Sequence, residues 1–175
     1  MEQLRIYTYG DPVLRKESQK IKDFNSEIRL FCRSMVSFLE KSKDGVGLAA
    51  PQVGFSRQII VINLFLVGAG QGLSPRGFLC LVNPRIIRKS DQTKKEIEGC
   101  LSLPGSLIKV KRAKEIEVEG WSLAENKKIV IKARNFLARV LQHEIDHLKG
   151  TLIIDYLPFW RRSREIKKLI KRVNS

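Results

Sequence analysis

Two histidines four residues apart constrain the fold of this chain more than any other feature. His143 and His147 lie near the end of an amphipathic segment, residues 135–149, and the chain has no other histidine. Positions four apart on an α-helix lie one turn apart on the same face, so both imidazoles can bind one metal ion. Glu144 lies beside them, as in zinc-binding helices whose glutamate carries protons. The segment therefore predicts a metal-binding helix, with a pair of half-buried, hydrogen-bonded histidines as the plainer alternative.

Two histidines do not complete a catalytic metal site, which normally has three protein ligands and one open position. The candidates for the third ligand are Cys100, Asp146, Glu144 and an acid further downstream. Asp146 lies about 100° from His147 around the helix and so points away from the shared face. Cys100 has the better claim, because the glycines and proline around it predict a tight, exposed backbone. A thiolate with two imidazoles also binds divalent transition metals well.

The composition predicts one globular domain over residues 1–175. Apolar residues make up 43% of the chain and charged residues 29%, and no apolar run approaches the ~20 residues of a membrane helix. The first residues lack the charged-then-apolar pattern of a secretory signal. The three cysteines are an odd and sparse set, which fits a reducing compartment better than a disulfide framework. We therefore expect a cytoplasmic protein without a membrane span.

The net charge of +15 indicates either a polyanionic partner or a solvated basic surface. In residues 158–175, four apolar residues recur at helical spacing: Ile166, Leu169, Ile170 and Val173. Seven basic residues cover the other faces: Arg161, Arg162, Arg164, Lys167, Lys168, Lys171 and Arg172. This pattern predicts a basic C-terminal helix that either packs on its own domain with a solvated face or contacts RNA or a membrane surface.

Hydrophobic spacing along the rest of the chain indicates both helix and strand. Apolar residues at helical spacing predict an N-terminal helix over residues 26–41, capped by Asn25 or Ser26. Apolar and alternating runs predict extended segments at residues 59–66, 78–82, 116–118, 129–131 and 152–157. Asn83-Pro84 is expected to close the second of these, and a turn at 124–126 to make a hairpin of the next two. The expected fold is α+β, with antiparallel sheets around a central metal-binding helix and a helix towards each end.

Residues 44–54 are rich in glycine and other small residues, which neither form a stable helix nor fill a core. Such residues allow the backbone to approach another group closely. The segment lacks the preceding strand and third glycine of a dinucleotide-binding loop and the lysine of a phosphate-binding loop. By itself it predicts a tight loop.

Three motifs, taken in order, resemble those of the peptide deformylases. They are Gly45-Val46-Gly47-Leu48-Ala49-Ala50-Pro51-Gln52, Glu98-Gly99-Cys100-Leu101-Ser102 and Gln142-His143-Glu144-Ile145-Asp146-His147. The resemblance extends over nearly all of the chain. It implies a cytoplasmic hydrolase of protein biosynthesis that removes the N-formyl group from the initiator methionine of nascent polypeptides and releases formate.

The resemblance also implies the metal centre and the groups around it. Cys100, His143 and His147 would hold one divalent metal ion per chain, ferrous iron in the cell and often zinc or nickel after purification. Glu144 would be the general base and acid. The Gln52 amide and the backbone N–H of Leu101 would stabilise the oxyanion.

The same resemblance implies how the N-formylmethionyl peptide is bound. The backbone around Gly45, Val46, Gly47 and Gly99 would pair with the extended peptide as an added strand. Phe136 and Val140 share the helix face of His143, and we expect them to line the methionine pocket. The family's C-terminal helix is thought to meet the ribosome, so residues 158–175 are a candidate ribosome contact.

The sequence departs from the family pattern at one place. Many relatives have arginine and glycine where this chain has Leu107 and Ile108, which affects contacts to the peptide beyond its first residue. Arg112 does match the family's arginine.

Three other functions compete with a deformylase. A metalloprotease would draw its third ligand from downstream, where no histidine follows His147. A silent paralogue that binds RNA would be expected to have lost a ligand or the acid. A structural metal site would supply four protein ligands.

Overall fold

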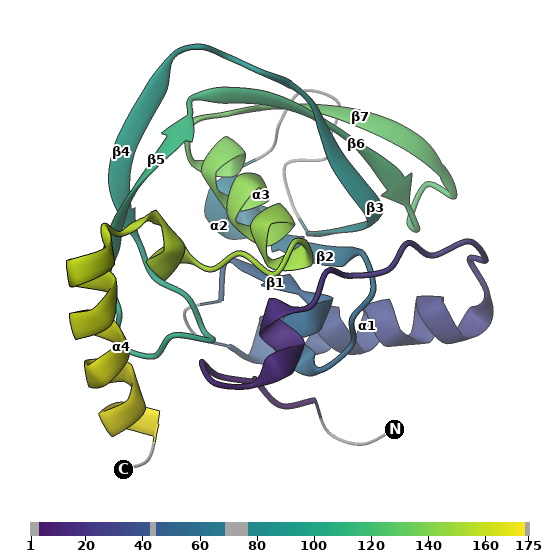
Figure 1. The fold of residues 1–175 in the computed structure, drawn as a ribbon. Helices are drawn as coiled ribbons and strands as arrows, with labels where there is room; N and C mark the ends of the chain where they lie inside the picture. Colours follow the sequence, from purple (N-terminus) through teal and green to yellow (C-terminus); the bar gives the residue numbers. More distant parts are fainter. Residues whose placement is uncertain (1–3, 43–44, 69–76, 174–175) are drawn as a thin grey trace.

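The computed structural model describes residues 4–42, 45–68 and 77–173 of the chain (Figure 1). It has four α-helices within these ranges: α1 (Ser26–Lys41), α2 (Leu64–Val67), α3 (Asn135–Leu148) and α4 (Phe159–Val173). The strands are β1 (Gly47–Ala49), β2 (Ile59–Asn63), β3 (Phe78–Lys89), β4 (Thr93–Glu98), β5 (Ile108–Ala113), β6 (Glu115–Ser122) and β7 (Lys127–Arg134).

The strands form two antiparallel sheets that surround α3. The larger sheet has the order β1-β2-β3-β6-β7, and β4 pairs with β5 in the smaller one. Figure 1 shows α3 at the centre, with the long strands arching over it, α1 on the opposite side of β1 and β2, and α4 at the outer edge. The predicted α+β fold around a central helix is confirmed.

The core is divided by these elements into three clusters. The largest packs α3 against the five-stranded sheet, and includes Leu137, Leu141 and Ile145. The second lies between α1 and the sheet, where Met35 and Leu39 are fully buried. The third joins β5, the segment around residues 152–154 and α4. Because α3 is packed from several sides, its polar residues are held in fixed positions inside the molecule.

The N-terminal helix and the hairpin agree with their prediction. α1 spans the predicted residues, and the Asn25 side chain caps it by accepting a hydrogen bond from the N–H of Ile28 at 3.0 Å. β6 and β7 pair in a continuous register from Glu115–Arg134 to Ser122–Lys127. Amphipathic spacing was sufficient for these elements because each has one face on the core.

Three boundaries differ from the prediction. β2 ends at Asn63, whose side chain caps the short helix α2 in place of the expected strand to residue 66. Asn83-Pro84 does not close β3, which continues to Lys89 through a shift in its register with β6. Asn83 adopts φ 52°, so the pair is accommodated as a bulge. Residues 152–157 contain a 3₁₀ helix, Ile153–Tyr156, where an extended segment was expected.

α4 forms as predicted and packs mainly through Leu169, which is fully buried. Ile166 is partly buried in the same cluster, whereas Ile170 is 49% exposed. The side chain of Val173 lies outside the described part of the chain. Within that part, no helix has both the length and the apolar character needed to cross a membrane.

Candidate metal centre

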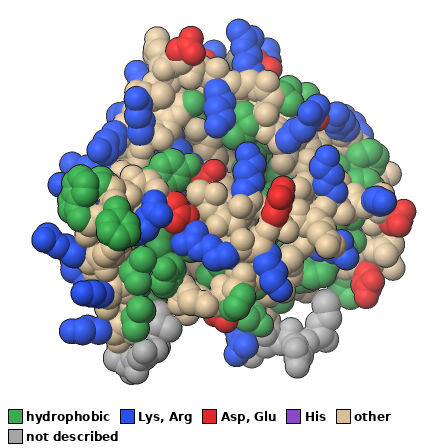
Figure 2. All heavy atoms as spheres, in the orientation of Figure 1, with side chains coloured by type: hydrophobic (Ala, Val, Ile, Leu, Met, Phe, Trp, Pro, Cys, Tyr) green, Lys and Arg blue, Asp and Glu red, His purple; other side chains and the backbone are tan. Residues whose placement is uncertain are grey.

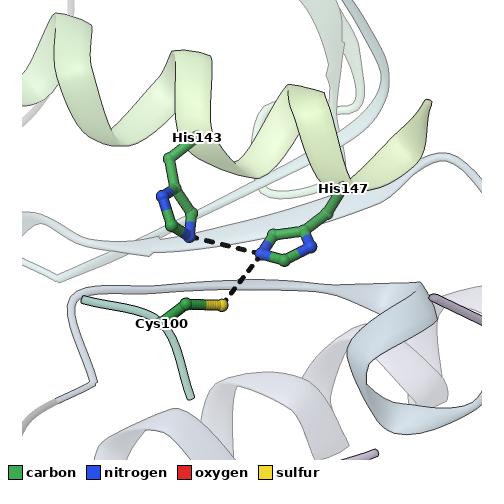
Figure 3. A group of neighbouring side chains, drawn as sticks. All are labelled: Cys100, His143 and His147. Carbon is green, nitrogen blue, oxygen red and sulfur yellow. Dashed lines mark hydrogen bonds between the residues drawn. The ribbon is translucent and has the colours of Figure 1, made fainter. Parts of the chain in front are cut away.

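Three ligand atoms from two parts of the chain meet beside α3 (Figure 3). Nε2 of His147 lies 3.3 Å from Sγ of Cys100 and 3.2 Å from Nε2 of His143. All three atoms lie within 4.8 Å of one another. Ligand atoms on a tetrahedral zinc ion would be about 3.3–3.6 Å apart, given its bond lengths to nitrogen and sulfur. The spacing and the chemistry of these donors therefore fit a divalent transition metal.

Secondary structure explains why the three atoms converge. The two histidines lie one turn apart on α3, which is the arrangement predicted from their spacing. Cys100 follows β4 at the start of a turn in which the N–H of Leu103 donates to the Cys100 carbonyl at 3.0 Å. The turn ends at Gly105, whose φ of 69° favours glycine.

Glu98 orients the imidazole ring of His143 through the nitrogen that faces away from Cys100 and His147. Nδ1 of His143 lies 3.0 Å from Oε2 of Glu98, so that Nδ1 can donate and leave the Nε2 lone pair directed at the other ligands. Two guanidinium groups, of Arg112 and Arg139, also donate to this carboxylate at 2.6–3.0 Å. Burial opposes ionisation of Glu98, but hydrogen bonds from His143 and Arg112 outweigh it and lower its pKa to about 2.

Glu144 is the buried acid of the site. Its Oε2 has no hydrogen-bond partner among the described residues, and burial raises the pKa of this carboxyl to about 7. Oε1 lies against Gly47, where a Cβ atom would overlap it. An acid with a pKa near neutrality can both accept and donate a proton at the pH of the cell.

Gln52 is buried and fixed by its own amide oxygen, which accepts a hydrogen bond from the Ala49 N–H at 2.8 Å. Its Nε2 is therefore directed at Ser102 Oγ, 3.2 Å away, and donates to Cys100 Sγ at 3.6 Å. This places an N–H donor beside the candidate metal ligands.

A cavity of about 560 Å³ opens beside the ligands. It brings together eleven of the twelve residues singled out from the sequence: Gly45, Val46, Gly47, Gln52, Gly99, Cys100, Leu101, Phe136, Val140, His143 and Glu144. The twelfth, His147, is 2% exposed and lies behind the cavity wall. β1, which contains Gly47, is an edge strand of the described sheet and has β2 as its partner.

Asp146, the other candidate ligand on α3, is directed away from the site. Its carboxylate accepts hydrogen bonds from Arg112 and, at 2.7 Å, from the Tyr156 hydroxyl. Arg112 thus links Asp146 to Glu98, and its side chain is 4% exposed. The prediction that Asp146 points off the shared face is confirmed.

Reasoning from the sequence missed Glu98 and Arg139 as members of this site. Glu98 stands two residues before Cys100 in the second motif, and this proximity was the available signal. Arg139 lies four residues before His143, hence on the same helix face, but an arginine at that spacing is more typical of a solvated face. Its partners, Glu96, Glu98 and the carbonyls of Lys94 and Val110, are brought to it by β4 and β5.

Comparisons with known proteins agree with this geometry. The sequence model of the polypeptide deformylase family matches residues 3–163. A peptide deformylase of Endomicrobium trichonymphae is 41% identical over 172 residues, which cover 98% of this chain and 96% of the relative. One from Halothermothrix orenii is 43% identical over 155 residues, covering 89% and 94%.

Solved structures show the same similarity in three dimensions. The crystal structure of the peptide deformylase from Ehrlichia chaffeensis superposes with a TM-score of 0.87 at 35% identity, covering 98% of this chain and 97% of that one. The Thermotoga maritima enzyme gives a TM-score of 0.78 at 34% identity, covering 90% and 99%. With a matching family sequence, a shared fold and one site that unites the three motifs, the chain belongs to the polypeptide deformylase family of metal-dependent hydrolases, which remove the N-formyl group from new polypeptides.

Proposed function

We propose that Cys100, His143 and His147 hold the metal ion of the deformylase reaction and that Glu144 moves its protons. The observation that carries this assignment is the position of the three ligand atoms beside a buried acid with an unpartnered oxygen. The cavity next to them is large enough for a methionine side chain and the start of a peptide.

When bound by Cys100, His143 and His147, a divalent ion would lower the pKa of a water molecule, so that hydroxide would be available near neutral pH. We infer that this ion is Fe²⁺ in the cell, and that Zn²⁺ or Ni²⁺ can replace it during purification. The donor set supports this inference, because one thiolate and two imidazoles suit each of these ions.

Glu144 takes a proton at its carboxylate from the attacking water and returns it to the nitrogen of the leaving amine. Its raised pKa of about 7 keeps both protonation states accessible during one catalytic cycle. Gly47 allows the carboxylate to occupy this position, because any larger residue would place an atom on Oε1. The role of Gly47 is therefore to leave space for Glu144 as well as for the peptide.

Attack on the formyl carbon places negative charge on its oxygen. Gln52 Nε2 and the backbone N–H of Leu101 are the proposed donors to this oxyanion. The hydrogen bond from Ala49 to the Gln52 amide oxygen supports the first assignment, because it fixes which end of the amide faces the site.

We propose that the formylated peptide binds in an extended conformation along the free edge of β1, between Gly45, Val46 and Gly47 on one side and Gly99 on the other. Phe136 and Val140 then line the pocket for the methionine side chain. Both belong to the cavity wall and lie on the α3 face that carries His143.

Residues 1–175 would form a single cytoplasmic catalytic domain whose substrates are nascent chains. α4 is a candidate contact to the ribosome, since its exposed face carries most of its basic residues. Deleting α4 would uncover the core around Leu169, so charge reversal is the better test. A Lys167→Glu, Lys168→Glu and Lys171→Glu variant should lose co-sedimentation with ribosomes at low salt, and unchanged co-sedimentation would rule this contact out.

The proposed function is tested by formate release from a formyl-Met-Ala-Ser peptide. Protein loaded anaerobically with iron(II) or with nickel(II) should turn the peptide over, and protein stripped by a chelator should not. A silent RNA-binding paralogue is the second candidate, and the metal-loaded protein would then bind RNA without releasing formate.

A further inference from the structure

The outer part of the cavity wall is uniformly apolar. Its exposed lining residues are Ile97, Gly99, Pro104, Gly105, Leu107 and Phe136. Three of them present large side chains to solvent, with exposed fractions of 73% for Leu107, 58% for Ile97 and 47% for Phe136. We call these three residues the apolar rim.

This rim is unusual for a chain in which 29% of residues are charged and the net charge is +15. The charged residues in the cavity wall are Glu98, Arg139 and Glu144, and all three are buried. Glu98 and Arg139 are paired with each other at 2.6 Å. None of the six exposed lining residues is charged, and large exposed apolar groups at a cavity mouth are typical of a binding surface.

The three side chains come from different elements around the mouth. Ile97 belongs to β4, Phe136 to the first turn of α3, and Leu107 to the segment just before β5. Cδ2 of Leu107 would lie 3.6 Å from a Cβ on Gly99, so Leu107 covers the backbone next to Cys100. The guanidinium of Arg172, from α4, lies against Gly105 of the cavity wall and donates to the Pro104 carbonyl at 3.4 Å.

We propose that the apolar rim is a specificity subsite that favours formylated peptides with a large apolar side chain at the second or third residue. This inference rests on the proposed function, because it takes the occupant of the rim to be the substrate that the cavity binds. An extended peptide with its methionine in the cavity must leave it across the rim, and its following side chains alternate between the two faces of the strand. Contact with the rim would bury apolar surface on both partners.

The test compares leucine with glutamine, which are similar in length and both uncharged, so that the basic surface does not bias the result. The peptides are formyl-Met-Leu-Ser against formyl-Met-Gln-Ser, and formyl-Met-Ala-Leu against formyl-Met-Ala-Gln. At one of these two positions, kcat/KM should be about tenfold higher for leucine. Ratios within about twofold at both positions would overturn the proposal.

Substitutions in the apolar rim then test whether these side chains cause the preference for leucine. Leu107→Ser and Ile97→Ser should each reduce the leucine-to-glutamine ratio to about threefold or less. Leu30→Ser is the matched control, because Leu30 is a 48% exposed leucine on α1 outside the cavity wall, and its ratio should stay unchanged. A ratio that survives both rim substitutions would also overturn the proposal.

Failure of the proposed function can be told apart from failure of the rim. If the metal-loaded protein turned over none of the peptides, the proposed function would fail. The subsite would then be tested by calorimetry, which compares the affinities of Met-Ala-Leu and Met-Leu-Ser with those of Met-Ala-Gln and Met-Gln-Ser. Tighter binding of a leucine peptide would support the subsite, and equal affinities would contradict it.

Discussion

The helices α3 and α4 are both amphipathic and have 14 and 15 residues, yet α3 is largely buried and α4 is largely exposed to solvent. Ten residues of α3 are buried, among them the polar Arg139, Gln142, Glu144 and His147. In α4, Leu169 is buried and six of the seven basic residues are exposed. Figure 2 shows Lys and Arg side chains over much of this face of the molecule, including the edge where α4 lies in Figure 1.

The difference shows that amphipathic spacing identifies a helix but does not decide what its polar face does. In α3 the sheets cover the polar face, so each polar group must find a partner or remain available for chemistry. Gln142 finds partners in the backbone of Ala113 and Ala138 at 2.9–3.2 Å. Glu144 Oε2 and His147 Nδ1 do not find one among the described residues. In α4 most of the charged side chains are exposed to solvent, although Arg162 donates to the Asp155 carbonyl and Arg172 to the Pro104 carbonyl.

The largest effect should come from Glu144→Ala. Removing the proposed proton carrier should lower kcat for formyl-Met-Ala-Ser by about 10²–10⁴-fold, while the variant should keep one metal ion per chain because the three proposed ligands remain. Metal content and formate release measured on the same sample check both parts. Full activity in this variant would show that Glu144 is not the general base.

Next in size is the effect of Glu98→Gln on folding. Loss of the carboxylate charge removes the main partner of two buried guanidiniums, and should lower the free energy of unfolding at neutral pH by about 3–5 kcal/mol. Because the folded pKa of Glu98 is about 2, its contribution is complete above pH 4.5 and is lost as the pH falls towards 2.

Urea unfolding at several pH values checks this prediction. The difference between wild type and Glu98→Gln should shrink steadily below pH 4.5. Glu125→Gln is the control, since Glu125 is paired with Lys127 on the surface and should change stability by less than about 0.5 kcal/mol. A difference that stayed constant down to pH 2 would contradict the low pKa.

Gly47→Ala should lower kcat/KM by about 10²-fold, because the new methyl group must displace the Glu144 carboxylate from its position. The matched control is Gly120→Ala in β6, where the added atom would meet its nearest neighbours at 3.4 Å. That variant should keep its activity. Equal losses in the two variants would mean that the effect comes from the sheet and not from Glu144.

The smallest effect should come from α4. Leu169→Ala should lower the free energy that protects the amides of α4 from hydrogen exchange by about 2 kcal/mol, and leave those of α3 protected. The same substitution at Leu141, which is fully buried in α3, should lower the global free energy of unfolding by about 4 kcal/mol. Simultaneous loss of protection in both helices would show that they unfold as one unit.

Elements with a local hydrophobic pattern could be predicted from the sequence. The prediction was wrong where tertiary contacts determine the end of a strand or the start of a helix. α1 and α3 were correctly placed because one face of each meets the core along its whole length. The continuation of β3 past Pro84 could not be foreseen, because it depends on pairing with β6, from Arg85–Glu119 to Lys89–Ile116. The short helix α2 depends on capping by a single side chain, Asn63.

The same limit applies to the site. The convergence of Cys100, His143 and His147, the proposed metal ligands, was predictable because these residues lie in dense motifs and spacing on one helix brings two of them together. The network of Glu98, Arg112 and Arg139 joins β4, β5 and α3, so no local pattern reveals it. The reason for glycine at Gly47 is equally non-local, since the atom it avoids belongs to Glu144.

The most direct test of the metal centre is X-ray absorption spectroscopy of the nickel-loaded protein, alongside Cys100→Ser. The assignment predicts one metal ion per chain with one sulfur neighbour and nitrogen or oxygen neighbours, and loss of the sulfur signal in the variant. A wild-type spectrum with nitrogen and oxygen neighbours alone, or a sulfur signal that persists in Cys100→Ser, would contradict it.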